Sequence, residues 1–564
     1  MAEQHLHGTP ASPGVALGLV WLRPERIDDG RHVAPAEREA QRQVALGALS
    51  AAAEALRELA AGLDGEEAAI VETGAMMALD PALTQSVADA VTADGLSAAA
   101  AILRATDGYA ETIAALNDET LAARADDVRS LGRRAARLTS DDLAREQPPG
   151  GEVIIVAHDL GPADVAELAG SLAGVALVGG GATGHAAIVA RSLGIPMVTG
   201  LAAELLAVDS GATVVLDGTA GSVIVDPSSA VSAATATEVQ RNRRAAKRAR
   251  AEHSRPAVTT DGRKIAVLAN VASRAELDAA LAEGAEGIGL LRTELAFLDA
   301  PDWPSEQQHS DALRPILAGL GGRCAIVRVL DFGADKSPPF LGRIPERGLE
   351  LLLAHPDALL SQLRAILQSA RDHELVLLLP MVDSPSQIVE TRGLLESAAG
   401  ELGIVSLPRI GSMVETPAAA ADARAIAAEC DLLSIGTNDL TASTLGVNRF
   451  TSGDGVAHDP RVLRLIASSV EAAHGAGIPI EVCGEAASDP RMLPLLVGLG
   501  IDELSVGAAQ VGAVRARIRA LDAADAGRLA RSTLAMEAAE QVEAAVLRHQ
   551  RPSESTRGAV QVGL

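Results

Sequence analysis

Apolar and polar residues follow a regular pattern from about residue 260 to the end of the chain. Short apolar runs typical of buried strands recur, and stretches with helical periodicity separate them. The predicted strands are KIAVLANV, GIGLLRTE, CAIVRVLD, LVLLLPMV, PRIGSMVET, LLSIGTND, PIEVCGEA and ELSVG. Eight such units within about 300 residues predict a (β/α)8 barrel over residues 259–564.

The first half of the chain has a different pattern, in two parts. Residues 35–145 are rich in Ala, Leu, Glu and Arg, and apolar side chains recur there at helical spacing. Two helical faces are formed by Leu49, Leu56, Leu59 and Leu63 and by Leu121, Val128, Leu131 and Leu138. Residues 153–226 return to short apolar runs, VIIV, GVALV, TVVLD and SVIV. We therefore predict a multidomain α/β protein whose α/β domain covers residues 1–34 and 146–227, with an all-helical subdomain inserted at 35–145.

A basic run separates the two halves of the chain. Residues 228–255 include EVQRNRRAAKRARAEH, which fits either a nucleic-acid patch or the solvated face of a helix that joins two domains. The formal net charge of −26 argues against general affinity for nucleic acid or anionic membranes, because like charges repel. We therefore interpret residues 228–258 as a helical linker and expect neither a nucleic-acid nor a membrane partner.

Composition narrows the class of protein further. Aromatic residues make up only 1% of the chain, so Ala, Val and Leu must fill most of the cores. The three cysteines form no CxxC pair, which favours a reducing compartment over a disulfide framework. The N-terminal stretch does not resemble a signal peptide, and no apolar run is long enough for a transmembrane helix. These features predict a cytoplasmic protein.

The glycine-rich stretch GGGATGHAAIVARSLGIP places His185 where a helix should begin. Free backbone N–H groups and the helix dipole favour an anion at such a position. A neutral imidazole is a nucleophile, and its phosphorylation would put a dianion against those donors. Thr183 could hydrogen-bond the group and Arg191 could pair with it. The alternative is a glycine-rich turn followed by a histidine that caps the helix.

Polar residues gather where the predicted barrel strands end. They are Arg292, Arg328, Asp331, Glu415, Asn438, Asp439, Cys483 and Glu485. A single polar residue at a strand end is often a loop anchor. Because barrels of this kind carry their active sites at the C-terminal ends of the strands, the recurrence of such residues predicts an active site there.

The charges at these strand ends suit a small phosphorylated acid. Arg292 and Arg328 offer planar donor forks for phosphate and carboxylate, and Lys336 adds a third positive charge. Glu415 and Asp439 offer the oxygen ligands that Mg²⁺ prefers. The alternative for these two carboxylates is salt bridges to the nearby arginines.

Cys483 follows the seventh predicted strand. Its thiol could fill core space, as we expect for Cys324 and Cys430. It could also protonate a carbon atom, provided that it stays a neutral acid. Glu485, two residues further on, would disfavour the thiolate and so hold the proton on sulfur.

Several stretches resemble enzyme I of the bacterial phosphotransferase system, the phosphoenolpyruvate–protein phosphotransferase family. They are ASPGVALG, ARADDVRSLGRR, GGATGHAAIVAR, GIGLLRTE, RVLDFGADK, GSMVETPAAA, SIGTNDLT and VCGEAASD, and they extend over essentially the whole chain. The resemblance implies an enzyme that takes the phosphoryl group of phosphoenolpyruvate onto His185 and releases pyruvate. It then passes the group to a histidine of a small HPr-like carrier protein, which is the first step of sugar uptake by this system.

The resemblance also implies a role for each candidate residue. Phosphoenolpyruvate would be bound by Arg292, Arg328, Lys336, Arg347, Asn438 and Arg449. Glu415 and Asp439 would hold Mg²⁺, and Cys483 would protonate the enolate of pyruvate. The α/β domain would be a swivelling phosphohistidine domain, the helical subdomain would dock the carrier, and the barrel would form a homodimer.

The chain departs from the family pattern in two places. Gly184 stands where the family has Ser before the active histidine. The segment after the third barrel strand is shorter and reads GRIPERGLELLL. Arg347 there matches the first of two family arginines, but Glu350 stands where the second is expected. A carboxylate near a trianionic ligand predicts weaker binding of phosphoenolpyruvate.

Two other functions share some of these sequence features. Pyruvate phosphate dikinase and phosphoenolpyruvate synthase share the histidine and barrel domains but need an ATP-binding module, and residues 1–150 are too few and lack a Walker-type loop. A weakened or regulatory paralogue could instead serve a different carrier. The retained arginines, carboxylates and cysteine argue against the loss of turnover.

Overall fold

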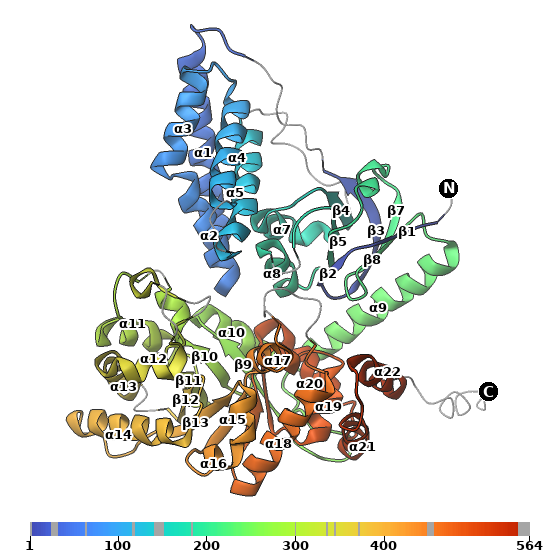
Figure 1. Ribbon diagram of the computed structural model, residues 1–564. Coiled ribbons are helices and arrows are strands. Elements are labelled where there is room, and N and C mark those ends of the chain that lie inside the picture. The colour runs from blue at the N-terminus through green and yellow to red at the C-terminus, as the bar shows by residue number, and fades with distance from the viewer. Residues whose placement is uncertain are drawn as a thin grey trace. The chain divides into compact units, whose positions relative to one another are not determined.

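The structure is a computed structural model whose chain divides into two compact units, Met1–Arg244 and Ala245–Leu564 (Figure 1). The described residues are 3–23, 32–61, 65–114, 119–139, 152–181, 184–298, 300–333, 337–342, 346–369, 373–447 and 456–550.

The first unit contains an eight-stranded sheet in the order β1-β8-β7-β3-β4-β5-β6-β2. Strands β3 to β6 pair in parallel, and the other pairs are antiparallel. The strands are β1 (Gln4–His7), β2 (Thr9–Ser12), β3 (Val15–Leu22), β4 (Val153–Ala157), β5 (Leu172–Leu177), β6 (Met197–Thr199), β7 (Thr213–Asp217) and β8 (Ser222–Val225). The four apolar runs predicted as strands form β4, β5, β7 and β8. The short strands β1, β2 and β6 were not predicted.

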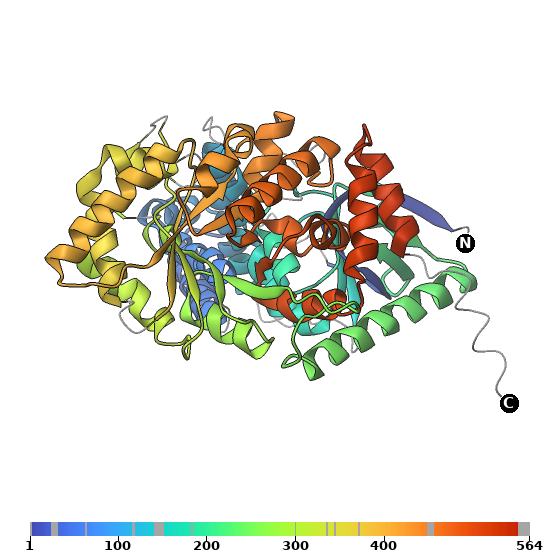
Figure 2. The same ribbon diagram turned by 90° about the horizontal axis from the view of Figure 1, so that it is seen from below.

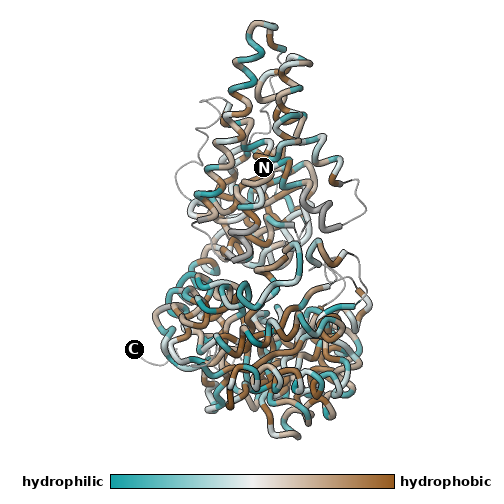
Figure 3. The backbone as a smooth tube through the Cα atoms, turned by 90° about the vertical axis from the view of Figure 1, so that its left-hand side faces the viewer, coloured by the Kyte–Doolittle hydropathy of each residue, from teal (hydrophilic) through white to brown (hydrophobic). Residues whose placement is uncertain are grey.

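The helical subdomain connects the neighbouring strands β3 and β4. These strands are parallel, so the chain must cross from the end of one to the start of the other, and the helices form that crossover. They are α1 (Arg38–Ala61), α2 (Gly65–Ala78), α3 (Pro81–Thr92), α4 (Ala98–Ala114) and α5 (Glu119–Arg137). Figure 3 shows apolar and polar residues alternating along them.

The predicted apolar faces are largely correct. Leu49, Leu56, Val128 and Leu131 are buried, and Leu59 packs against the same core. The prediction for Leu138 was wrong, because α5 ends at Arg137 and the residue beyond it is 41% exposed. Leu63 and the side chain of Leu121 lie outside the described residues.

Three more α-helices lie in, or begin in, the described part of the first unit. They are α7 (Pro162–Leu168), α8 (His185–Ser192) and α9 (Ser229–Ala251). The division between the two units falls within α9. Between residues 229 and 244 of this helix, Thr235 is the one buried side chain, as a solvated helix requires.

The second unit is built on a closed barrel of eight parallel strands, which confirms the predicted fold class. The strands follow one another in chain order, and the last pairs with the first. They are β9 (Ala266–Val271), β10 (Ile288–Arg292), β11 (Ala325–Arg328), β12 (Leu375–Leu379), β13 (Arg409–Val414), β14 (Leu432–Ile435), β15 (Ile480–Val482) and β16 (Glu503–Gly507). Each lies within one of the predicted runs.

Helices surround this barrel (Figures 1 and 2). They are α10 (Arg274–Ala282), α11 (Glu306–Leu317), α12 (Gly348–Ala354), α13 (Pro356–Ser369), α14 (Pro385–Glu401), α15 (Pro417–Ala421), α16 (Ala423–Ala427), α17 (Thr437–Leu445), α18 (Pro460–Ala476), α19 (Met492–Leu499), α20 (Val511–Ile518), α21 (Ala523–Thr533) and α22 (Ala539–Gln550). The main core lies between strands and helices, and a smaller cluster inside the barrel includes Leu378, Met413 and Cys483. Among the described helices, none is long and apolar enough to cross a membrane.

Candidate active site

His185 is the first residue of α8, where the sequence predicted that a helix begins. Gly184 is the N-cap residue, with extended backbone angles. Thr183 lies outside the described residues. Arg191 donates a hydrogen bond to the carbonyl of Ala11 at 2.9 Å, so this contact ties α8 to strand β2.

The imidazole of His185 contacts a carboxylate of the helical subdomain. Nδ1 lies 2.5 Å from Oδ2 of Asp127 on α5, and the two side chains are 19% and 16% exposed. An ionised carboxylate accepts hydrogen bonds and cannot donate them. Nδ1 of His185 therefore carries the proton in this contact, and Nε2 carries the lone pair. A nucleophilic His185 would therefore react through Nε2. Sequence reasoning missed Asp127, although the residue lies in the quoted stretch ARADDVRSLGRR.

A polar seam holds α5 beside the loop and helix that follow β4. Arg133 donates to Asp159 at 2.9 Å, and Arg134 donates to Glu167 at 2.6 Å. Asp164 is buried against α5 and accepts a hydrogen bond from the Ser130 hydroxyl at 3.2 Å. Burial would raise the pKa of the Asp164 carboxyl, but the nearby arginines, led by Arg23, hold it below its usual value. The seam therefore fixes the helix that carries Asp127.

In the second unit, Arg292 and Arg328 end neighbouring strands and are paired in register. The Arg328 side chain is only 5% exposed; it is bonded to Glu294 and lies 3.1 Å from Asp331. Burial would lower the pKa of Arg328, but Glu294, Asp331 and Glu415 outweigh it and raise the pKa above the ordinary value. Its Nε has no hydrogen-bond partner among the described atoms, so a buried donor remains for a ligand.

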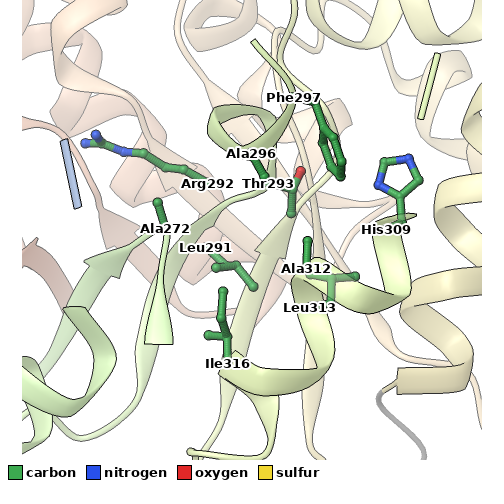
Figure 4. Close-up of a pocket in the computed structure, with 10 residues that line it drawn as sticks. All are labelled: Ala272, Leu291, Arg292, Thr293, Ala296, Phe297, His309, Ala312, Leu313 and Ile316. Atoms are coloured by element: carbon green, nitrogen blue, oxygen red, sulfur yellow. The ribbon is translucent and has the colours of Figure 1, made fainter. Parts of the chain in front are cut away.

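A small pocket lies between β10 and α11, beside Arg292 (Figure 4). In Figure 4 the Arg292 side chain extends away from the other lining residues, which are mostly apolar. His309 packs edge-on against Phe297, with ring centroids 5.0 Å apart, and burial lowers the pKa of this histidine to about 4. This pocket is an apolar space outside the barrel strands.

Glu415 follows β13 and is buried at the end of the barrel. Its Oε2 accepts a hydrogen bond from the backbone N of Met381 at 2.9 Å, and Met381 adopts a left-handed φ of 51°. A side chain at Gly436 would come within 2.5 Å of the Glu415 carboxylate, so glycine is needed there. Burial, then Asp331 and Asp439, raise the pKa of Glu415 to about 7. Among the described residues, Asp331 and Asp439 therefore lie close enough to Glu415 to disfavour its negative charge, and Arg328 offsets them only in part.

Such an excess of negative charge suits a divalent cation. Among the described residues, no three His, Cys, Asp or Glu side chains form a ready metal cage. Glu415 and Asp439 offer two carboxylates, which fits Mg²⁺, because this ion commonly keeps waters and substrate phosphate oxygens as its other ligands. The predicted ligand pair is therefore chemically suitable for Mg²⁺.

Of the other predicted substrate ligands, two lie among the described residues and two do not. Arg347 lies 3.8 Å from Asp439, and the Asn438 side-chain oxygen accepts from the backbone N of Glu485 at 3.0 Å. Lys336 and Arg449 lie outside the described residues. Glu350 is exposed in the first turn of α12.

Cys483 follows β15 inside the barrel mouth and is buried. Its Sγ lies 3.3 Å from the Ser434 hydroxyl. Burial, followed by the charge of Glu481, raises the pKa of the thiol to about 12, so the thiol is protonated at neutral pH. The expectation that Glu485 has this effect was wrong: Glu481 is the carboxylate with the largest influence. The sequence feature that could have identified Glu481 is an acidic residue inside an otherwise apolar strand. Cys430 lies in the main core, and Cys324 packs against the barrel interior.

Comparison with known proteins identifies the family to which the chain belongs. Residues 246–523 match the PEP-binding domain of PEP-utilising enzymes, residues 7–124 match their N-terminal domain, and residues 149–221 match their mobile domain. The chain is 37% identical to a phosphoenolpyruvate-protein phosphotransferase of Haloferax volcanii over 95% of this chain and 97% of the relative. It is 36% identical to one of Streptomyces coelicolor over 96% and 98%. A solution structure of Enzyme I (nEIt) is 31% identical, with a TM-score of 0.34, and covers 42% of this chain and 99% of that one.

The closed barrel and the matches to the PEP-binding and mobile domains define an enzyme that uses phosphoenolpyruvate. The chain belongs to the phosphoenolpyruvate–protein phosphotransferase family, and the resemblance to enzyme I is confirmed.

Proposed function

We propose that this enzyme phosphorylates itself on His185 and then passes the phosphoryl group to a histidine of an HPr-like carrier protein. The observation that carries the proposal is the contact between His185 Nδ1 and Asp127, which leaves Nε2 as the nucleophile at the start of α8. The N–H groups of that helix start favour the phosphoryl dianion once it has been transferred.

In the first half-reaction the barrel would hold phosphoenolpyruvate. Arg292 and Arg328 would bind its phosphate and carboxylate, helped by Lys336, Arg347, Asn438 and Arg449. Glu415 and Asp439 would hold Mg²⁺, which when bound supplies positive charge to the phosphate and the developing enolate. The ester P–O bond breaks as the bond from phosphorus to Nε2 of His185 forms.

The enolate of pyruvate left by this transfer needs a proton on its terminal carbon. Cys483 is suited to donate it, because its raised pKa keeps the thiol protonated until a strongly basic carbon is present. A C–H bond forms as the S–H bond breaks, and pyruvate results.

In the second half-reaction the phosphohistidine would react with the carrier. We propose that residues 1–34 and 146–227 form the phosphohistidine domain, that residues 35–145 dock the carrier, and that residues 228–258 link both to the barrel at 259–564. The barrel would also form a homodimer, and the enzyme would act in the cytoplasm at the first step of sugar uptake. Because one histidine reacts at two places, the linker must allow the phosphohistidine domain to move.

The test is labelling with radioactive phosphoenolpyruvate in the presence of Mg²⁺. The label should be stable in alkali and labile in acid, as a phosphoramidate is, and His185→Ala should abolish it. Label that persists in this variant would refute the assignment. Incubation of the labelled enzyme with purified HPr-like proteins should then move the label to the carrier.

A further inference from the structure

Glu481 is a carboxyl group that the proposed mechanism does not use, and it is completely buried inside the barrel. It lies on β15 two residues before Cys483. Side chains alternate along a strand, so both face the barrel interior, while Ile480 and Val482 pack in the outer core. A buried acid therefore lies directly below the proposed proton donor.

Ser434 connects the two groups. Ser434 lies on strand β14, which neighbours β15, and it is paired in register with Glu481. Its hydroxyl lies 2.8 Å from Glu481 Oε2 and 3.3 Å from Cys483 Sγ. A single hydroxyl thus contacts both the buried acid and the thiol.

The surrounding barrel is shaped to admit this acid. A side chain at Gly289 would come within 2.3 Å of Glu481 Oε1, so glycine leaves the space that the carboxyl group fills. The Ser505 hydroxyl donates to Asn270 at 2.7 Å, and the Asn270 amide donates to the carbonyl of Cys483 at 3.1 Å. Polar groups therefore line the interior around both Glu481 and Cys483.

The environment of Glu481 favours its neutral form. Burial and the charge of Glu503, its register partner on β16, raise its pKa well above the ordinary value, although the hydrogen bond from Ser434 opposes them. Glu481 in turn raises the pKa of the thiols of Cys483 and Cys324. Its Oε1 has no hydrogen-bond partner among the described atoms.

We propose that Glu481 and Ser434 form a proton relay that returns a proton to Cys483 after each turnover. The relay rests on the proposed function, because it acts through the thiol that protonates the enolate. After the S–H proton has moved to carbon, Sγ takes the hydroxyl proton of Ser434 as Ser434 takes the carboxyl proton of Glu481. Glu481 is left as a carboxylate and regains its proton from solvent, so each pyruvate consumes one solvent proton.

Two exchange reactions of the full-length enzyme distinguish the proton relay from phosphoryl transfer and protonation of the enolate. In D₂O with Mg²⁺, phosphoenolpyruvate and ¹³C-labelled pyruvate, reversible phosphoryl transfer moves the carbon label into phosphoenolpyruvate without any carrier. That exchange can proceed with one proton passing back and forth between carbon and Cys483. Deuterium enters the methyl group of pyruvate only if Cys483 also exchanges its proton with solvent.

Glu481→Gln keeps the shape of the side chain and an acceptor for Ser434 but removes the transferable proton. We expect carbon exchange close to wild type, with deuterium incorporation relative to it lowered roughly tenfold or more. Ser434→Ala should give the same result from the other end of the relay. Glu374→Gln, the same change at an exposed carboxylate paired with Arg409, should leave both exchanges unchanged.

A wild-type ratio of deuterium to carbon exchange in both variants would overturn the relay, since the proton would then come from water in the active site. Absence of carbon exchange in the wild-type enzyme would refute the proposed function, and the relay with it. Infrared spectroscopy gives a check that does not require turnover. The wild-type protein should show the carbonyl band of a buried protonated carboxyl group, and Ser434→Ala should shift it; absence of the band, or an unchanged band, would also overturn the relay.

Discussion

Replacement of Asp127 by Asn should slow phosphoryl transfer from a phosphorylated carrier to His185. When Nε2 bonds to phosphorus, the imidazole ring becomes positively charged, and the carboxylate 2.5 Å from Nδ1 stabilises that charge. The amide of Asn carries no negative charge, and it can either accept a hydrogen bond from Nδ1–H or donate one to an unprotonated Nδ1. A hydrogen bond to a charged group contributes about 1.5–3 kcal/mol, which corresponds to a rate loss of roughly 10- to 150-fold.

Rapid-quench measurement of transfer from a purified, phosphorylated HPr-like carrier to the unphosphorylated enzyme gives this rate. Nitrogen chemical shifts of His185 in the unphosphorylated protein report which ring nitrogen holds the proton. We expect the Nδ1–H tautomer to dominate in the wild type and to lose its dominance in Asp127→Asn. Loss of packing alone would not redistribute the proton between the two nitrogens.

Asp126 provides a matched control on the same helix. Its exposed carboxylate pairs with Arg129 at 2.9 Å, and Asp126→Asn should leave both the rate and the tautomer unchanged. If Asp127→Asn accepts the phosphoryl group at the wild-type rate and keeps the wild-type tautomer, the contact has no part in the chemistry.

Three further predictions concern the second unit. Cys483→Ala should slow pyruvate formation far more than it weakens binding of phosphoenolpyruvate; a collapse of binding with normal turnover at saturation would exclude the role of proton donor. Glu350→Arg should lower KM by at most about fivefold, with the difference shrinking at high salt, because the residue is exposed and its repulsion is screened; an unchanged KM at low salt would mean that Glu350 does not act on the ligand. Burial lowers the pKa of His309 from 6.5 to about 4, so the unfolded chain binds more protons between these values, and the protein should lose on the order of 3 kcal/mol of stability as pH falls from 6.5 to 4. The free energy of unfolding of His309→Leu, measured with denaturant, should fall less steeply with decreasing pH than that of the wild type. An identical dependence on pH would contradict this assignment.

The parts of the fold that could be predicted are those in which burial leaves a local pattern. Every barrel strand is covered on both faces, so each appears as a continuous apolar run between polar loops. The strands that escaped prediction are short and pair with distant segments. β2, for example, contains Pro10 and pairs with β6 nearly two hundred residues later. The four residues of β2 alone do not indicate that this segment pairs with β6.

In the site, likewise, the sequence predicts which residues are present but not which of them pair with one another. Strand-end positions identified Arg328, Glu415 and Cys483, because the topology alone brings those positions together. Which groups pair there depends on side-chain reach across the site. Arg328 is held by Glu294 and Asp331, and Arg347 lies close to Asp439 rather than beside Glu350.

The two acids near Cys483 show why distance along the chain is a poor guide to electrostatic influence. Glu481 and Glu485 are each two residues from the thiol. Glu485 lies beyond the end of β15, exposed to water, where a high dielectric constant weakens its effect on the thiol. Glu481 lies on the strand itself, where the alternation of side chains points it into the barrel beside Cys483 and away from solvent. The strand period and the closure of the barrel together therefore decide which carboxyl group controls the thiol, and both can be inferred from sequence once the barrel is recognised.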